Sequence, residues 1–75
     1  METTNRLVKL GKKQLEDRHY DNAVNTFEQA ILLNQKDPDL WNLKGIALRS
    51  LGRYNEAIEC FNKSLEIDPR DKNAS

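Results

Sequence analysis

The sequence predicts an all-α fold of four antiparallel helices, arranged as two tandem helix-turn-helix repeats. The first observation behind this prediction is that residues recur 34 positions apart. A fixed period of this length is typical of a repeat architecture, in which each unit buries its apolar face against a neighbour. The second observation is that apolar residues within each segment are spaced three and four apart, as on one face of a helix. The recurring pairs are Gly11/Gly45, Tyr20/Tyr54, Ala23/Ala57, Phe27/Phe61 and Asp37/Asp71.

The first helix is predicted near residues 4–17, with Thr3 or Thr4 as its N-cap. At its far end Arg18 occupies the position that Gly52 holds in the second repeat. Glycine suits the left-handed residue that ends a helix, so Arg18 either strains this turn or ends the helix differently. The inward face is expected to carry Leu7, Leu10, Gly11, Gln14 and Leu15.

The second helix is predicted at about residues 21–34. Asp21 near its start and Lys36 beyond its end agree in sign with the helix dipole. The expected packed face consists of Ala23, Val24, Phe27, Ala30 and Ile31.

The third helix has the clearest start, because Asp37-Pro38 places a capping residue before a proline at the first helical position. This helix is expected to end at about Leu51, closed by Gly52. Its inward residues are predicted to be Trp41, Gly45, Leu48 and Leu51.

The fourth helix, about residues 55–67, repeats the second and stops at Asp68-Pro69 because proline cannot continue the hydrogen-bond ladder. Small residues at the helix crossings, such as Gly45 and Ala57, are expected to let the backbones approach while a phenylalanine fills the space beside them. The expected packed face carries Ala57, Ile58, Phe61, Ser64 and Leu65.

The bulk composition bounds the class of protein. The chain has 75 residues, of which 37% are hydrophobic and 32% are charged. This length accommodates one small domain, whose core rarely supplies more than about 3–5 kcal/mol. No apolar run approaches the roughly 20 residues of a membrane span. The N-terminus lacks a secretory apolar run, and the single cysteine, Cys60, cannot form an internal disulfide. We therefore expect a cytoplasmic protein with no membrane contact.

The charge balance argues against a nucleic-acid partner. The formal net charge is zero, with 12 basic and 12 acidic side chains. Residues 1–20 carry a net +2 and residues 21–75 a net −2. A nucleic-acid-binding domain is usually strongly basic, so we expect no nucleic-acid partner.

The repeated positions resemble the tetratricopeptide repeat (TPR) family, whose pattern reads W-x2-L-G-x2-Y, then A-x3-F, then P. The second half matches at Trp41, Gly45, Tyr54, Ala57, Phe61 and Pro69, and the first half keeps Leu10-Gly11, Tyr20, Ala23 and Phe27. The departures are Leu7, Gln14 and Gln35 in the first half and Lys44 and Leu48 in the second. The resemblance implies TPR-like repeats at about 4–37 and 38–71 in a short right-handed superhelical array, followed by a polar tail at 72–75.

Candidate catalytic groups are scarce in this chain. His19 is the single histidine and is interpreted as a solvated turn residue. A zinc site needs about four ligands of the Cys/His type, which one histidine and one cysteine cannot supply. Cys60, beside Phe61, is interpreted as a half-buried small hydrophobic residue. We therefore predict a non-enzymatic protein with no cofactor and no metal.

The resemblance also implies a binding surface, because the first helix of each TPR pair lines a concave groove for peptides or partner helices. Apolar residues rimmed by charge, as at these positions, are typical of an interaction site. Members that bind chaperone tails hold a terminal carboxylate with lysine and asparagine. The matching positions here are Val8, Lys12 and Leu43, so we reject that function. The groove residues are predicted to be Asn5, Val8, Lys9, Lys12, Glu16, Asp39, Asn42, Leu43, Ile46 and Arg49.

Self-assembly is the alternative function. Two repeats are fewer than the three or so that stability generally requires. The fourth helix is expected to expose Ile58, Leu65 and Ile67, and each apolar side chain left in water forgoes about 1.5–3 kcal/mol. This predicts a homodimer, formed either by packing of the C-terminal faces or by exchange of helices between chains, unless the chain is a fragment of a longer array. An RNA-associated repeat that uses the basic residues Arg6, Lys9, Lys12 and Lys13 is the least favoured hypothesis.

Overall fold

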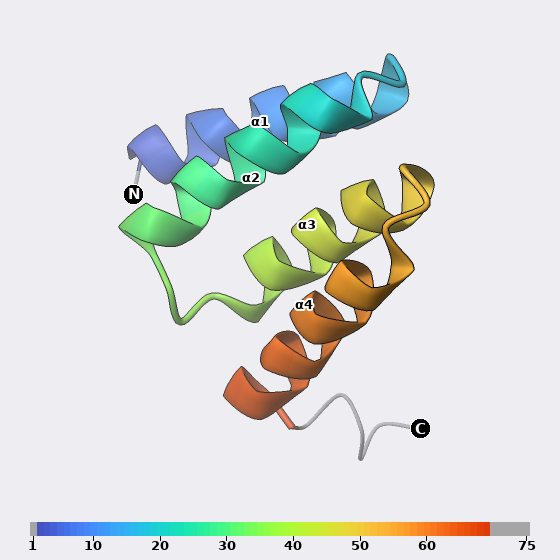
Figure 1. Cartoon of the computed structure of the whole chain (residues 1–75). Coiled ribbons are helices and arrows are strands. Elements are labelled where there is room, and N and C mark those ends of the chain that lie inside the picture. The colour runs from blue at the N-terminus through green and yellow to red at the C-terminus, as the bar shows by residue number, and fades with distance from the viewer. Residues whose placement is uncertain (1, 70–75) are drawn as a thin grey trace.

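Two helical hairpins stack on one another in the computed structural model, which describes residues 2–69 (Figure 1). The helices are α1 (Glu2–Glu16), α2 (Tyr20–Leu33), α3 (Pro38–Ser50) and α4 (Tyr54–Ile67). Helix α1 packs on α2, α3 packs on α4, and α2 packs on α3 to join the hairpins. The predicted all-α fold of two helix-turn-helix repeats is therefore confirmed. The tail at 72–75 and the last two residues of the second predicted repeat lie outside the described residues.

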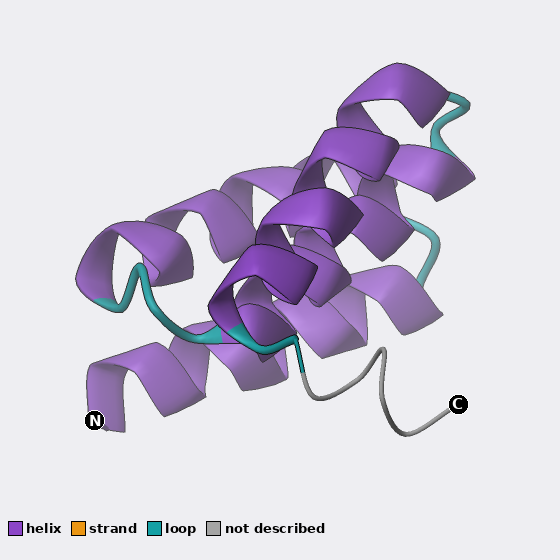
Figure 2. Cartoon of the chain, turned by 90° about the horizontal axis from the view of Figure 1, so that it is seen from below, coloured by secondary structure: helices purple, strands orange, loops and turns teal. Residues whose placement is uncertain are grey.

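The short connections alternate between the two ends of the stack, as the view from below also shows (Figure 2). The α1–α2 and α3–α4 turns lie at one end, and the α2–α3 loop lies at the other. This alternation makes successive helices antiparallel. It also gives α1 and α3 the same direction, so that equivalent residues of the two repeats lie on equivalent faces.

The start of α3 confirms the capping prediction. The backbone N–H of Asp39 donates to Asp37 Oδ1 at 3.0 Å, and Pro38 is the first helical residue. The helix ends at Ser50, with Leu51 as its C-cap. By contrast, α2 and α4 each begin one residue earlier than predicted, without a side-chain cap.

The predicted N-cap of the first helix is wrong, because α1 already begins at Glu2. Thr3 and Thr4 lie inside the helix, and Thr4 is buried. Thr4 occupies the position of Pro38 in the second repeat. Proline forces the residue before it out of the helical region, whereas threonine places no such restriction on Thr3, so the helix continues through it.

The two hairpin turns share one geometry, although their residues differ. Arg18 has φ 65° and Gly52 has φ 83°, so both take the left-handed conformation. In each turn the next residue closes the helix: His19 N–H donates to the carbonyl of Gln14 at 2.8 Å, and Arg53 N–H donates to that of Leu48 at 2.9 Å. The strained alternative proposed for Arg18 is therefore the one observed.

The close helix crossing that the small residues predict is confirmed. A Cβ atom built on Gly45 would lie 2.6 Å from Cε1 of Phe61, closer than real Cβ atoms approach. A Cβ atom on Gly11 would collide in the same way with Phe27. Glycine recurs at these two positions because a ring of the partner helix occupies the space of its side chain.

The buried core lies where the hairpins meet. One cluster joins α2 to α3 and α4 through Val24, Phe27, Ala47, Leu48 and Cys60, and a second joins Ala30 and Ile31 to Leu40. Leu10 was predicted to face inward but is 48% exposed, and Ile58 is 54% exposed, as expected for the face of the fourth helix that a following repeat would cover. Their equivalents, Lys44 and Val24, face the neighbouring hairpin. Leu10 and Ile58 point outward because, among residues 2–69, no further hairpin lies beside them.

Candidate functional site

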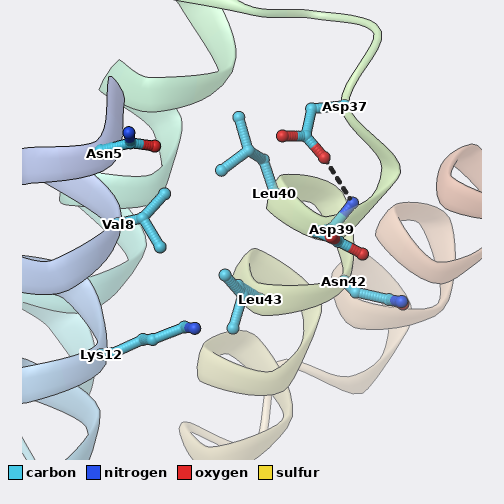
Figure 3. A pocket seen from close by; sticks show the side chains of 8 residues that line it. All are labelled: Asn5, Val8, Lys12, Asp37, Asp39, Leu40, Asn42 and Leu43. Carbon is cyan, nitrogen blue, oxygen red and sulfur yellow. Dashed lines mark hydrogen bonds between the residues drawn. The ribbon is translucent and has the colours of Figure 1, made fainter. Parts of the chain in front are cut away.

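A groove with a volume of about 360 Å³ separates α1 from α3 (Figure 3). Helix α1 provides one wall, and the first turns of α3 with the residue that caps them provide the other. Six of the ten predicted groove residues line this groove, so the structure brings most of the predicted site together. The lining residues are Asn5, Val8, Lys12, Asp37, Asp39, Leu40, Asn42 and Leu43.

Helical spacing places these side chains at the groove. Val8 and Lys12 are four residues apart on α1, and Leu40 and Leu43 are three apart on α3, so each pair lies on one helix face. Val8 and Leu43 point toward one another across the groove (Figure 3). Both are half-buried, whereas Leu40 is only 1% exposed and packs on α2. The middle of the groove is therefore apolar.

The two walls carry opposite charge. Lys12 is exposed on the α1 wall, and its ammonium group extends toward Leu43 (Figure 3). Asp37 and Asp39 lie on the α3 wall, where the helix dipole stabilises carboxylates. A bound segment can thus place an apolar side chain between Val8 and Leu43, an acidic group at Lys12 and a basic group at Asp39.

Four predicted groove residues do not line the groove: Lys9, Glu16, Ile46 and Arg49. Lys9, Glu16 and Arg49 are exposed, and Ile46 is half-buried. Glu16, Ile46 and Arg49 lie beyond the last lining residues, toward the C-terminal ends of α1 and α3.

Two lining residues, Asp37 and Leu40, were missed from the sequence. Asp37 was interpreted only as a helix cap. Leu40 had a usable signal, because it is an apolar residue at the position that Arg6 holds in the first repeat. An apolar residue at that position indicates contact with the preceding hairpin, and Leu40 makes this contact through Ile31.

A second cavity, of about 420 Å³, lies where the α2–α3 loop meets α4 and includes Trp41 and Ile67. The indole N–H of Trp41 donates to the carbonyl of Gln35 at 3.0 Å. The ammonium groups of Lys44 and Lys63 each lie 5.9 Å from the centroid of this ring. Trp41 thereby ties the loop to α3 and α4, and we assign it a structural role.

The remaining candidate side chains do not converge on a chemical site. Among residues 2–69, no group of three or more His, Cys, Asp or Glu residues is placed to hold a metal ion. Cys60 is buried rather than half-buried, and burial raises the pKa of its thiol above the ordinary value. His19 is exposed in its turn. None of the helices in the described part of the chain is long and apolar enough to cross a membrane.

Two stacked hairpins, with a groove lined by the first helix of each, define a helical-repeat protein. Residues 7–37 and residues 38–71 each match a family model of the tetratricopeptide repeat. The chain therefore belongs to the tetratricopeptide repeat family.

Relatives of known sequence come from distant organisms. An uncharacterized protein from Methanocaldococcus jannaschii is 46% identical over 48 residues, which is 64% of this chain and 56% of the relative. The Hsp70-Hsp90 organising protein from Plasmodium falciparum is 42% identical over 67 residues, or 88% of this chain and 26% of the relative. The peroxisomal targeting signal receptor from Saccharomyces cerevisiae is 32% identical over 50 residues, or 67% of this chain and 8% of the relative. The chain thus spans at most 56% of the length of these relatives.

Proposed function

We propose that this chain is a non-enzymatic protein-interaction module that binds a peptide or helix of a partner protein in the groove between α1 and α3. The observation that carries the proposal is the pair Val8 and Leu43. These residues lie on different hairpins and face each other across the groove, half-buried, with Lys12 beside them. Apolar side chains rimmed by charge are a recognised signature of an interaction site.

The names of two relatives support a protein ligand. One relative is named for organising Hsp70 and Hsp90, and another is named as a receptor for a targeting signal. Both names describe recognition of other proteins, and this chain resembles a small part of each. We therefore propose a protein or peptide partner for this chain as well.

The composition of the groove specifies the kind of peptide. A terminal carboxylate is held best by several cationic side chains, but Lys12 is the only basic residue among those that line the groove, and Val8 and Leu43 beside it are apolar. We propose that the main contact is an aliphatic side chain of the ligand inserted between Val8 and Leu43. An acidic group next to it on the ligand pairs with Lys12, which fixes the direction of the peptide.

The test begins with peptides selected from a random display library on the immobilised wild-type chain. Binding of each selected peptide is then measured by fluorescence polarisation for the wild type, Leu43→Glu and Lys9→Glu. Lys9 is the matched control, because it is exposed on α1 outside the groove. We expect Leu43→Glu to weaken binding at least about tenfold, since it places a charge in the apolar middle of the groove. Lys9→Glu is expected to have little effect.

Equal binding to wild type and Leu43→Glu would contradict the proposed groove. Circular dichroism of each variant shows whether the fold is retained. A second measurement, the chemical-shift changes of backbone amides on adding the peptide, locates the site independently. Shifts at Val8, Lys12 and Leu43 support the proposal, and shifts confined to α4 contradict it.

A further inference from the structure

Helix α4 carries an apolar stripe on one side, which we define as Tyr54, Ile58, Phe61 and Leu65. The spacing of four, three and four is that of a seam along which two helices pack. Tyr54 is 61% exposed and Ile58 is 54% exposed, while Phe61 and Leu65 are half-buried. The α4 stripe is therefore a substantial apolar surface in contact with solvent.

The first hairpin shows how such a stripe is buried. The equivalent residues of α2 are Tyr20, Val24, Phe27 and Ile31. Helix α3 packs along α2, and Val24, Phe27 and Ile31 are at most 7% exposed there. Val24 is 5% exposed on α2, whereas Ile58, at the equivalent position of α4, is 54% exposed. The α4 stripe thus has the same chemistry as a surface that this protein covers with a helix elsewhere.

Helix α1 of a second copy is a poor occupant of the α4 stripe. Helix α3 presents Leu40 and Ala47 to α2, and both are buried there. At the same positions α1 carries Arg6 and Lys13, which are exposed. Head-to-tail stacking of two copies would press these two cations against Ile58 and Leu65, and burial of charge beside apolar groups is unfavourable. Copies of this chain are therefore not expected to stack head to tail.

The residues that flank the α4 stripe favour a symmetric partner. On α2 the flanking positions hold Asp21 and Glu28, and Glu28 forms an ion pair with Lys44 of α3. On α4 the same positions hold Asn55 and Asn62. Uncharged amides both donate and accept hydrogen bonds, so they can pair with themselves across a two-fold axis. Two copies of α4 can approach along this side without like-charge repulsion at the flanks.

We propose that the α4 stripe is a homodimer interface, in which α4 of one copy packs against α4 of a second copy about a two-fold axis. Such an interface is self-complementary and closes at two copies. An antiparallel arrangement places the N-terminus of each α4 beside the C-terminus of its partner, which suits their dipoles. The surface is one helix face, so it falls among small interfaces and the dissociation constant is expected to be about micromolar or weaker.

The α4 stripe shares no residue with the groove, so the dimer leaves both grooves open. One particle then presents two copies of the groove to a partner. A partner with two suitable segments would bind more tightly to the dimer than to the monomer through effective concentration. The dimer and the peptide-binding groove can therefore fail or succeed independently.

The test is sedimentation equilibrium of the 75-residue chain from about 5 µM to about 1 mM. We expect the average mass to rise from 8.7 kDa toward twice that value and then to level off. Ile58→Glu is expected to stay at the monomer mass, because it places a charge at the centre of the stripe. The matched control is Leu10→Glu, at a leucine that is similarly exposed on α1, and it is expected to dimerise like the wild type.

A wild-type chain that stays monomeric at about 1 mM would overturn the proposal, as would dimerisation of Ile58→Glu equal to that of the wild type. A mass that rises beyond the dimer would indicate open stacking and would also overturn it. Addition of a peptide with the sequence of residues 37–52 tests whether the α4 stripe instead receives an α3-like helix. If the wild type is monomeric but binds this peptide, the stripe receives an α3-like helix of a different partner. Binding of the selected groove peptides by Ile58→Glu would show that the groove is intact in this variant. This measurement distinguishes failure of the dimer from failure of the groove.

Discussion

The carboxylate of Glu28 on α2 lies 3.2 Å from the ammonium group of Lys44 on α3, and this ion pair joins the two hairpins. The Lys44 side chain is only 20% exposed and also lies 5.9 Å from the Trp41 ring. The TPR pattern has leucine at this position. The lysine therefore replaces an apolar contact between the repeats with a charged one, which specifies that α3 packs beside the acidic flank of α2.

This ion pair is expected to contribute modestly to stability. In a double-mutant cycle with Glu28→Gln and Lys44→Met, the coupling free energy should be about 0.3–1 kcal/mol, because Glu28 is half exposed. The coupling should shrink between about 0.05 M and 0.5 M salt as screening increases. Urea unfolding followed by Trp41 fluorescence measures it. The pair Lys13 and Asp17, exposed and 4.0 Å apart, is the control and should show less coupling; a larger value there would contradict this account.

Substitutions at the left-handed residues of the two hairpin turns, Arg18 and Gly52, are expected to have opposite effects on the stability of the protein. Arg18→Gly should stabilise the protein by about 0.5–1 kcal/mol, because relief of the left-handed strain exceeds the added entropy of the unfolded chain. Gly52→Ala should destabilise it by about 1 kcal/mol. No atom lies within 4 Å of a Cβ at Gly52, so this loss comes from the backbone alone. Thermal unfolding checks both signs, and a destabilised Arg18→Gly would show that the side chain of Arg18 matters more than its φ angle.

The two helix-crossing glycines are expected to differ in their tolerance of alanine. Alanine gains about 1 kcal/mol of helix propensity at either position but collides with a phenylalanine ring. Phe61 is partly exposed and can move outward, whereas Phe27 is fully buried. Gly11→Ala should therefore lose about 1–3 kcal/mol, and Gly45→Ala should lose less. Chemical denaturation of the two variants gives the comparison, and equal losses would argue against relief through Phe61.

The stability that depends on Cys60 is expected to fall as the pH rises through the ordinary pKa of a thiol. Burial raises the pKa of Cys60 in the folded chain, so above the ordinary value the unfolded state binds fewer protons than the folded state. The stability difference between wild type and Cys60→Ala should thus be larger at about pH 7 than at about pH 10. Urea unfolding at the two pH values measures it, and other titrating groups cancel because both proteins contain them. A constant difference would contradict the prediction.

The sequence was sufficient to predict the helices wherever a local signal decided them. Asp37-Pro38 combines a cap with a proline, and both act within one turn of the chain. The predicted start of the first helix was wrong. Thr3 is a possible cap, but no proline follows it to force the helix to begin there. Leu10 was predicted to face inward because spacing identifies an apolar face but not whether another helix covers it. Its exposure depends on the stacking of whole hairpins.

The candidate groove could be located from the sequence only through the repeat register. Positions equivalent in the two repeats gave most of its walls, including Val8 and Leu43. Ile46 and Arg49 were included because the family resemblance places them at groove positions, but the groove ends before them. Leu40 was missed because it belongs both to the core and to the groove. Whether a residue lies in both the core and the groove depends on how closely the two hairpins approach. The spacing of residues within one helix does not determine this distance.

The second repeat differs from the first in one respect that bears on how longer proteins of this kind could be built. Helix α3 carries Leu40 and Ala47 on the side that docks onto the preceding hairpin, and α4 carries Ile58 and Leu65 on the side that can receive the next one. Helices α3 and α4 therefore form a unit whose two outer surfaces are compatible with each other. A tandem duplication of this unit would yield a rod that can be extended, because α4 of each copy provides the surface on which α3 of the next copy packs. The first repeat, with Arg6 and Lys13 on its outer side, could only initiate such a rod.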